Sequence, residues 1–271
     1  MSNSSEIRKP IAAVFIDGNN LYYAAKSAFQ IAKHDVDALA RKVCAMKGWD
    51  VGSVNFYSGI PSKEHDSYSY DRWDKKIAAM QQQGVNVVTR ELAYRKTKVV
   101  DQEGNEKISI RTEEKGIDVR IALDVARTAY EQKADVFIIF SQDQDLLEAC
   151  LEVKRISSEQ KRAVRICSAF PYSDSSRNHR GIRDVEAISI DESTYMQCLD
   201  NRPYHKTKQE VLDFSKRPNP KENLIKSEFT ATQAKFAASA QRFVAELSQD
   251  KPAINRYKKP RPGKNTSKTA A

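Results

Sequence analysis

The sequence predicts an α/β fold in which a parallel sheet is covered by helices on both faces. Apolar, β-branched segments alternate along the chain with longer segments of helical periodicity, which is the pattern of a parallel sheet. Two of the apolar segments, VFIDGNN at 14–20 and FIIFSQDQDLLEA at 137–149, end abruptly in carboxylates. Open α/β sheets place their sites at such strand ends, so these acids are expected to meet in one cleft.

In the first half of the chain, short apolar runs mark the strands and longer amphipathic runs mark the helices. Gly84 is expected to end a helix and release the chain into the next strand. The expected elements, in order, are a strand at 11–17, a helix starting at 19–21, a helix at 36–46, a strand at 54–57, a helix at 70–83 and a strand at 85–91.

In the second half, the turn sequence DQEGNE separates two alternating stretches around 99–100 and 107–110, which is a hairpin signal. The apolar run VFIIF is the strongest strand of the chain. The expected elements are a helix at 115–133, strands at 136–140 and 163–167 with a helix at 146–156 between them, and a late strand at 187–190.

The α/β domain is expected to span 11–199, followed by a linker at 200–227 that is rich in proline and charge. At 228–248 the aromatic and aliphatic residues return at helical spacing, which predicts an amphipathic helix. Docking on the α/β domain is one interpretation of this helix. The other is a homodimer or a partner protein held through its apolar face.

Most of the net charge of +9 comes from the C-terminal tail at 249–271, which carries seven Lys and Arg residues and, beyond Asp250, no acid. Its prolines and small polar residues leave too little apolar content for a core, so the tail is expected to be disordered. A flexible basic tail raises non-specific affinity for nucleic acid. The alternative is a tail that only improves solubility.

The composition also argues against a membrane-spanning protein and a secreted protein. No stretch approaches the roughly 18 apolar residues of a membrane span, and the N-terminus lacks the apolar segment of a signal peptide. A cytoplasmic protein without a membrane partner is therefore expected. The four cysteines are scattered, without a close CxxC pair, so they are expected to be reduced thiols in or near the core.

The first candidate site residue is Asp17, directly after an apolar strand and before Gly18, Asn19 and Asn20. The glycine permits close approach of backbone or ligand, and the asparagines offer oxygens without added charge. Asn20 is thus expected to support the site through hydrogen bonds. The alternative role of Asp17 is to cap the following helix.

Asp143 and Asp145 form the second candidate pair, in the turn SQDQD after the strongest strand. In a strand-to-helix turn both carboxylates can face a metal or its waters. Helix N-termini favour carboxylates without any chemistry, however. The alternative is therefore an N-cap at Asp143 and a first-turn acid at Asp145.

The third motif is EKGID, which continues into the helical VRIALDVA. Asp118 lies near the helix start, and Asp124 lies about 120° around the helix from it, on the side of Ile121. Asp118 is the better metal candidate, whereas Asp124 on an apolar face needs a partner and is a supporting or structural carboxylate. Lys115 is expected to bind the scissile phosphate, with a surface ion pair as the alternative.

Carboxylates that converge without cations repel one another, so this cluster predicts a divalent metal. A positive rim around such a centre suits a polyanion. The expected nucleic-acid-binding residues are Arg90, Arg95, Lys96, Lys98, Arg177, Arg180 and Arg183, with ordinary surface charges as the alternative. Three tyrosines are candidates for stacking on unpaired bases, with half-buried packing as the alternative: Tyr22, Tyr23 and Tyr94. Packing is the favoured role for Tyr23.

The three motifs VFIDGNN, EKGIDVRIALD and VFIIFSQDQDL, in this order, resemble the NYN domains of the PIN-like nuclease superfamily. The resemblance covers about 11–190 and implies a PIN-like, Rossmann-like sandwich. It further implies that Asp17, Asp118 and Asp143 are metal-binding acids. Asp145 matches the second aspartate of the family's turn motif, and Ser141 matches the serine of that turn. Asp124 matches the aspartate that the family carries in its helical motif, ALD.

Three residues of the turn depart from the family pattern: Gln142 replaces a glycine, Gln144 a serine and Leu146 a phenylalanine. Loss of the glycine is expected to alter the conformation of the turn and to leave less room for a phosphate to come close to its backbone. All the acids remain, which favours activity over a domain that only binds.

The resemblance implies a hydrolase that uses Mg²⁺ or Mn²⁺ to cut phosphodiester bonds, with RNA favoured over DNA. Cleavage is expected to leave a 5′-phosphate and a 3′-hydroxyl, with Lys115 and Ser141 steadying the phosphate. One alternative is a non-catalytic RNA-binding or adaptor protein on the same fold. Another is a metal-dependent phosphoesterase that acts on a nucleotide or a small phosphate ester.

Overall fold

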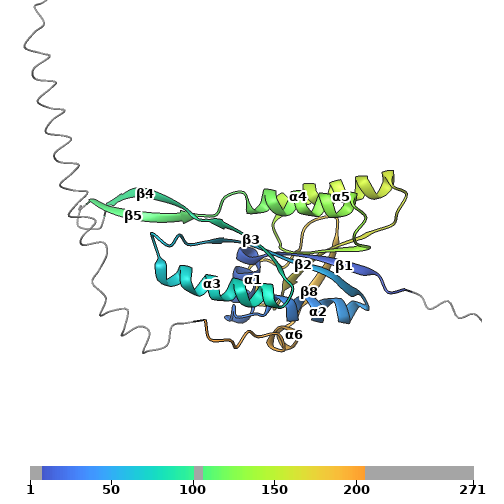
Figure 1. Ribbon diagram of the computed structural model, residues 1–271, viewed down its shortest axis with the longest axis horizontal. Helices are drawn as coiled ribbons and strands as arrows, with labels where there is room; N and C mark the ends of the chain where they lie inside the picture. Colours follow the sequence, from blue (N-terminus) through green and yellow to red (C-terminus); the bar gives the residue numbers. More distant parts are fainter. Residues whose placement is uncertain (1–7, 101–105, 205–271) are drawn as a thin grey trace, which may run out of the picture. The chain divides into compact units, whose positions relative to one another are not determined.

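The computed structural model describes residues 8–100 and 106–204 (Figure 1), all within one compact unit that ends at Lys206. The expected helix at 228–248, the tail at 249–271 and nearly all of the linker at 200–227 lie outside the described residues. The domain limits therefore remain predictions.

A six-stranded parallel sheet forms the centre of the fold, with strand order β3-β2-β1-β6-β7-β8. From β1 the chain adds strands outward to β3 and then returns to the other side of β1 with β6. The order therefore reverses between β1 and β6, which is where open α/β sheets bind ligands. The strands are β1(Ile11–Asp17), β2(Asp50–Ile60), β3(Asn86–Glu91), β6(Val136–Phe140), β7(Arg165–Pro171) and β8(Glu186–Ile190).

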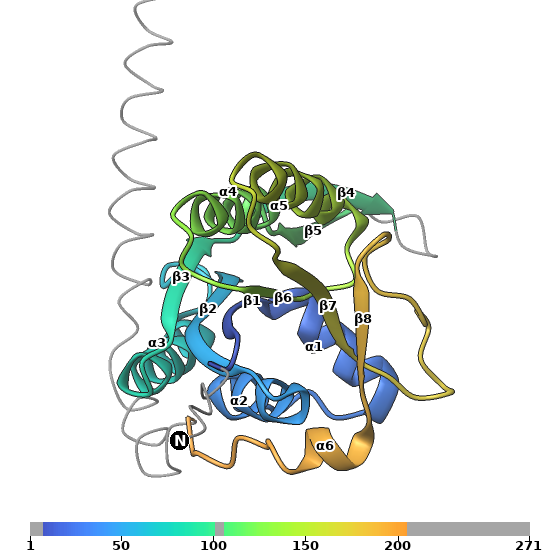
Figure 2. The same ribbon diagram turned by 90° about the vertical axis from the view of Figure 1, so that its right-hand side faces the viewer.

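Helices cover both faces of this sheet (Figure 2). One face carries α1(Gly18–Phe29), α2(Val36–Lys47), α3(Ser67–Gln82) and the short α6(Glu192–Met196), and the other carries α4(Ile117–Tyr130) and α5(Leu147–Glu159). Each face has its own apolar cluster, and β1 contributes alternate residues to the two: Val14 to one and Phe15 to the other. This alternation follows from the two-residue period of a strand and explains the continuous apolar run of β1.

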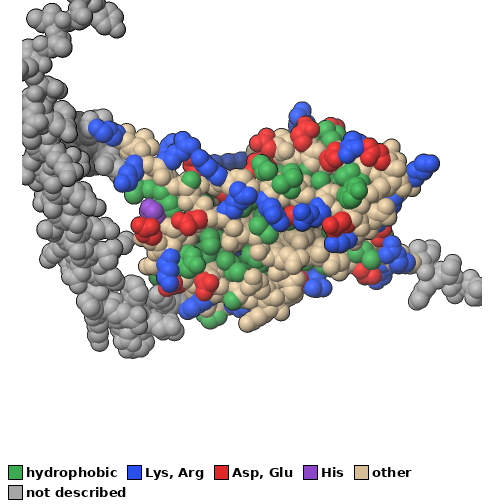
Figure 3. Space-filling model, turned by 45° about the horizontal axis from the view of Figure 1, so that its top comes forward, with side chains coloured by type: hydrophobic (Ala, Val, Ile, Leu, Met, Phe, Trp, Pro, Cys, Tyr) green, Lys and Arg blue, Asp and Glu red, His purple; other side chains and the backbone are tan. Residues whose placement is uncertain are grey.

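The hairpin β4(Ala93–Val100) and β5(Glu106–Glu113) forms a separate two-stranded antiparallel sheet. It projects from the body of the domain (Figure 1), and Lys and Arg side chains lie along it (Figure 3). Arg95 pairs with Glu113 at 2.9 Å, whereas Lys96 is exposed.

The predicted α/β class is confirmed, and most differences concern element ends. β2 begins at Asp50 rather than 54 and ends at Ile60 rather than 57. Ser53 and Ser58, on either side of the predicted segment, interrupt the apolar signal of a strand that pairs along its length. The helix expected at 115–133 spans only Ile117–Tyr130, because Gly116 before it has φ +67° and Gln132 after it has φ +54°, both outside the helical region. Helix α6 has only five residues and was not predicted from the sequence.

All four cysteines lie within the described residues, and they are free and buried, which confirms the expected reduced thiols. Among the described helices, none combines the length and the apolar character that crossing a membrane requires.

A buried histidine makes the stability of this fold sensitive to acid. His34 is 3% exposed, and its Nδ1 lies 2.8 Å from the Tyr195 hydroxyl. Burial lowers the pKa of His34 from 6.5 to about 3. Between these values the unfolded chain binds a proton that the folded protein does not, so stability falls as the pH drops below 6.5, by up to about 1.4 kcal/mol per pH unit.

We therefore expect the melting temperature, followed by circular dichroism, to fall between pH 7 and pH 5. His34→Gln removes an ionisable group from this position and is expected to flatten the profile. Parallel profiles for the two proteins would contradict the assignment to His34.

Candidate active site

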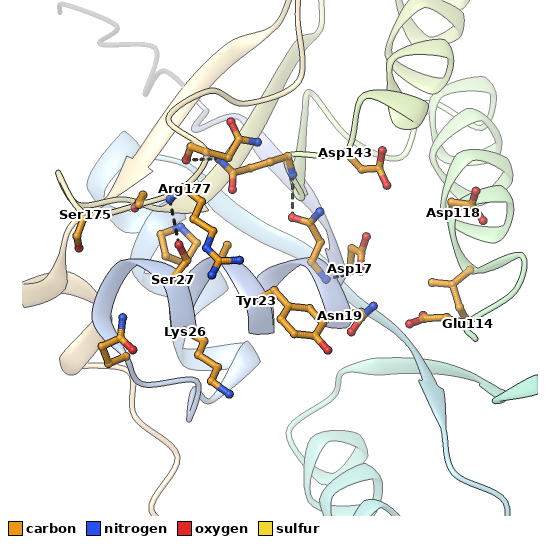
Figure 4. A pocket seen from close by; sticks show the side chains of 18 residues that line it. Asp17, Asn19, Tyr23, Lys26, Ser27, Glu114, Asp118, Asp143, Ser175 and Arg177 are labelled. Carbon is orange, nitrogen blue, oxygen red and sulfur yellow. Dashed lines mark hydrogen bonds between the residues drawn. The ribbon is translucent and has the colours of Figure 1, made fainter. Parts of the chain in front are cut away.

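An open cleft of about 840 Å³ lies at the carboxyl ends of β1 and β6 (Figure 4). Its lining comes from the end of β1, the exposed side of α1, the segment at 114–118, the turn after β6 and the loop at 171–178. Four acids of this lining, Asp17, Glu114, Asp118 and Asp143, lie toward one end of the cleft (Figure 4).

Asp17 is the last residue of β1 and also the N-cap of α1, where its Oδ1 accepts from the Asn20 amide at 2.9 Å. Its Oδ2 accepts from the Ser141 hydroxyl at 3.4 Å. Gly18 is required beside it, since a Cβ there would lie 2.5 Å from Phe56. Capping and a place in the cleft are therefore not exclusive alternatives for Asp17.

Asp143 lies in the neighbouring turn and caps the short helix η1(Gln144–Leu146) by accepting from the Asp145 amide at 3.0 Å. The Ser141 hydroxyl accepts from the Asp143 amide at 3.1 Å. Because Ser141 also contacts Asp17, this buried serine joins the two strand ends. Ser141 therefore orients the two acids. Because it is only 1% exposed, it offers no surface to a phosphate, contrary to the role expected from the sequence.

Glu114 is a further acid of the cleft, and it was not among the predicted site residues. Its Oε1 accepts from the Gly59 amide at 2.9 Å, which ties it to the carboxyl end of β2. The available signal was its place in the EKGID motif, one residue before Lys115. Asp118 lies in the first turn of α4 and lines the same cleft.

Two of the acids, Asp17 and Glu114, have a raised proton affinity. Burial, followed by the charge of Asp143, raises the pKa of Asp17, and burial with the charges of Asp17 and Asp118 raises the pKa of Glu114. Within the described part of the chain, none of the four acids makes an ion pair with a Lys or Arg. This end of the cleft therefore carries uncompensated negative charge.

The carboxylate oxygens of these four acids are donors that fit a hard divalent cation. Among the described residues, no three Asp, Glu, His or Cys side chains stand close enough to enclose a metal ion. Mg²⁺ commonly uses one or two carboxylates and completes its shell with waters and substrate phosphate, which does not require a closed protein cage.

Three other predicted site residues lie away from the cleft lining. Asp145 and Lys115 are exposed and are not part of it. Asp124 accepts from the Tyr57 hydroxyl at 3.0 Å and from Arg120 Nε at 2.9 Å. These two partners make Asp124 a structural carboxylate that joins α4 to β2.

The two glutamines that depart from the family pattern brace the following loop against the acidic turn. Gln142 Nε2 donates to the carbonyls of Asn178 and Arg180 at 3.1 and 2.9 Å. Gln144 Nε2 donates to the Gly181 carbonyl at 3.1 Å, and its Oε1 accepts from the Arg183 amide at 3.2 Å. The glycine-free turn is thus part of a cross-link between two loops.

The Gln142 backbone contributes a further link. Its amide donates to Asn20 Oδ1 at 2.9 Å, so the Asn20 side chain holds the turn after β6 against the start of α1. The expected supporting role of Asn20 corresponds to this contact.

The predicted nucleic-acid-binding residues occupy two places. Arg95, Lys96 and Lys98 are on the hairpin, and Arg90 lies at the base of it, with its guanidinium beside Gly116. The second place is the loop after β7, where Arg177, Arg180 and Arg183 are exposed. Of these seven residues, Arg177 lines the cleft.

The packing role that the sequence favours for Tyr23 is wrong. Its side chain is 62% exposed and lines the cleft, whereas Leu21 and Ala25 supply the buried side of α1.

The fold and the cleft define an open α/β domain with an acidic centre at its switch point. A family model described as the NYN domain matches residues 11–182, and because this is more than half of the chain, the chain belongs to the NYN-domain family. The NYN domain is a PIN-like nuclease domain, which makes nucleic acid the substrate that the family suggests.

A search of curated proteins gave no significant match. Among solved structures, the chain is similar to one described as an isopentenyl phosphate kinase substrate complex, at 14% identity over 59% of this chain and 90% of the other. Its TM-score of 0.27 carries no argument about fold or function.

The raised pKa of Asp17 yields a prediction about stability. In the folded protein the ionised carboxylate is disfavoured, so above its pKa this charge reduces stability. Asp17→Asn keeps a side-chain oxygen for the Asn20 amide and removes the charge. In EDTA at pH 7, we expect the variant to melt at a higher temperature than the wild type.

The exposed Asp145→Asn variant is the matched control and is expected to melt within about 1 °C of the wild type. A melting temperature for Asp17→Asn at or below that of the wild type would contradict the charge interpretation.

The glutamine brace yields a second prediction. Gln142→Ala with Gln144→Ala removes the side-chain bonds to the loop at 178–183, and we expect faster amide hydrogen exchange there, with a stability loss of about 1–3 kcal/mol. Gln132→Ala, outside the cleft lining, serves as the control. Unchanged exchange at 178–183 would show that the brace does not hold the loop.

Proposed function

We propose that this protein is a metal-dependent nuclease that hydrolyses phosphodiester bonds, in RNA above all, and leaves a 5′-phosphate and a 3′-hydroxyl. The supporting observation is the convergence of four carboxylates, without basic partners in the described residues, on one cleft of a PIN-like fold. Cations at the rim of this cleft and along the hairpin suit a polyanionic substrate.

Asp17, Asp118 and Asp143 are the residues that would hold Mg²⁺ or Mn²⁺, with Glu114 added to the predicted set. A bound divalent ion supplies a water of lowered pKa and neutralises charge that develops on the leaving oxygen. The hard carboxylate oxygens of the cleft match the preference of these ions.

The remaining residues of the site orient these acids. Ser141 contacts both Asp17 and Asp143, and Asn20 holds the turn that carries Asp143. Asp17 and Asp143 also accept backbone amides at helix starts, which restricts their rotation and leaves each one oxygen free of a backbone bond. Preorganised ligands of this kind lower the cost of ordering the site when substrate arrives.

Substrate capture falls to the basic hairpin and the loop after β7. Lys115 is exposed two residues before α4 begins, and we retain it as a group that approaches the substrate phosphate from outside the cleft. Asp145 remains a less favoured ligand, because it lies outside the lining.

We further propose a cytoplasmic setting, which suits four free buried thiols. Self-association through the segment at 228–248 remains part of the proposal.

The test is cleavage of end-labelled RNA by the full chain in Mn²⁺ or Mg²⁺, with EDTA as the blank. Asp143→Asn keeps the acceptor for the Asp145 amide and removes a ligand charge, so we expect cleavage to fall at least 100-fold while the melting temperature is kept. Products are expected to carry 5′-phosphates, as judged by their susceptibility to phosphatase.

Asp50→Asn, at an exposed acid outside the cleft lining, is the matched control and is expected to keep most of the activity. Absence of metal-dependent cleavage on single-stranded, structured and duplex RNA or DNA would refute the proposal. RNA binding without any cleavage would favour a non-catalytic adaptor.

A further inference from the structure

The cleft extends well beyond its acidic end. Its other end is lined by Lys26 and Ser27 from α1 and by Ser175, Arg177 and Asn178 from the loop after β7. Tyr23 lies between the two ends (Figure 4). A volume of about 840 Å³ is in the range of small-molecule sites and exceeds what one scissile phosphate needs.

One side of α1 follows the length of this cleft. Asn19, Tyr23, Lys26, Ser27 and Gln30 all line it, and their spacing of three and four residues places them on one helical face. From Asn19 to Lys26 the helix advances about 10 Å, so Lys26 lies well away from the acidic centre.

Tyr23 is positioned to offer its ring to a ligand. The side chain is 62% exposed, and Tyr22 contacts it edge to face with ring centroids 5.2 Å apart. Lys26 lies over the Tyr22 ring at 5.9 Å. An edge contact leaves a ring face of Tyr23 available for stacking, which is the usual contact of an unpaired base with protein.

Arg177 is held by its backbone from two sides. Its amide donates to Ser27 Oγ at 3.0 Å, and the adjacent Asn178 carbonyl accepts from Gln142. Ser173 Oγ also donates to the Ala28 carbonyl at 2.8 Å. The guanidinium is exposed and, among the described residues, has no ion-pair partner, so a fixed base presents a free cation to the cleft.

We propose that Tyr23, Lys26 and Arg177 form a subsite for a nucleotide that flanks the cleaved bond of a single-stranded substrate. Tyr23 stacks on the base, and Lys26 and Arg177 bind the adjoining phosphodiester. Paired bases are stacked on their neighbours, so a duplex does not offer this contact, and the subsite selects unpaired strands. This inference rests on the proposed nuclease function.

The first test is equilibrium binding by fluorescence anisotropy, with the full chain in EDTA and a labelled 12-nucleotide RNA, single-stranded or annealed to its complement. Tyr23→Ala is expected to weaken single-strand binding about 5- to 150-fold, and duplex binding less than twofold. Tyr23→Phe keeps the ring and is expected to bind like the wild type. Tyr130→Ala, 74% exposed on α4 and outside the cleft lining, is the control.

The second test changes the two cations together. Lys26→Ala with Arg177→Ala is expected to weaken single-strand binding at least tenfold and to reduce the slope of log K against log salt by about 1.4, which is the value for two phosphate contacts on a single strand. Lys33→Ala with Lys75→Ala removes two exposed lysines outside the cleft lining and is expected to change the slope less.

The outcomes separate the two proposals. If RNA is cut in an Asp143-dependent way but the Tyr23 and cation variants bind single strands like the wild type, the subsite is refuted and the nuclease function stands. If the variants lose single-strand binding as expected but no metal-dependent cleavage occurs, the subsite stands as a binding site and the nuclease function fails. Equal weakening of single-strand and duplex binding by Tyr23→Ala would also refute the subsite.

Discussion

The parallel pairing of β1 with β6 is the constraint on which the site depends. Ile16 pairs with Phe140, so Asp17 and Ser141 are the next residues at the same edge of the sheet. Helices α1 and η1 begin there, and Asp17 and Asp143 cap them. The strand order reverses at this pair, which leaves a cleft that no crossover helix covers.

This arrangement concentrates negative charge at a cost to stability. Burial and neighbouring acids raise the pKa of both Asp17 and Glu114, so their ionised forms are disfavoured in the folded protein. Capping bonds and the Ser141 hydroxyl offset part of that cost. The site therefore resembles other functional centres, in which residues needed for activity reduce the stability of the folded protein.

The atypical turn connects the acidic centre to the opposite end of the cleft. Gln142 contacts the loop that carries Arg177 through its side chain and contacts Asn20 through its amide. A glycine at 142 would lack the two side-chain bonds. Gln142 and Gln144, which depart from the family pattern, thus fix the acidic end of the cleft relative to its basic end. A basic end suits the binding of a polyanion. An acidic end that holds a cation suits the neutralisation of charge that develops during cleavage.

The sequence by itself determined the strands β1 and β6, the hairpin and the placement of Asp17 and Asp143 at strand ends, because burial and alternation have short periods that neighbouring residues reveal. Tertiary structure alone decided that Glu114 rather than Lys115 lines the cleft, that Asp124 pairs with Tyr57 across 67 residues, and that Tyr23 is exposed. These outcomes depend on which surfaces the strand order brings together, and local periodicity carries no record of contacts between distant segments.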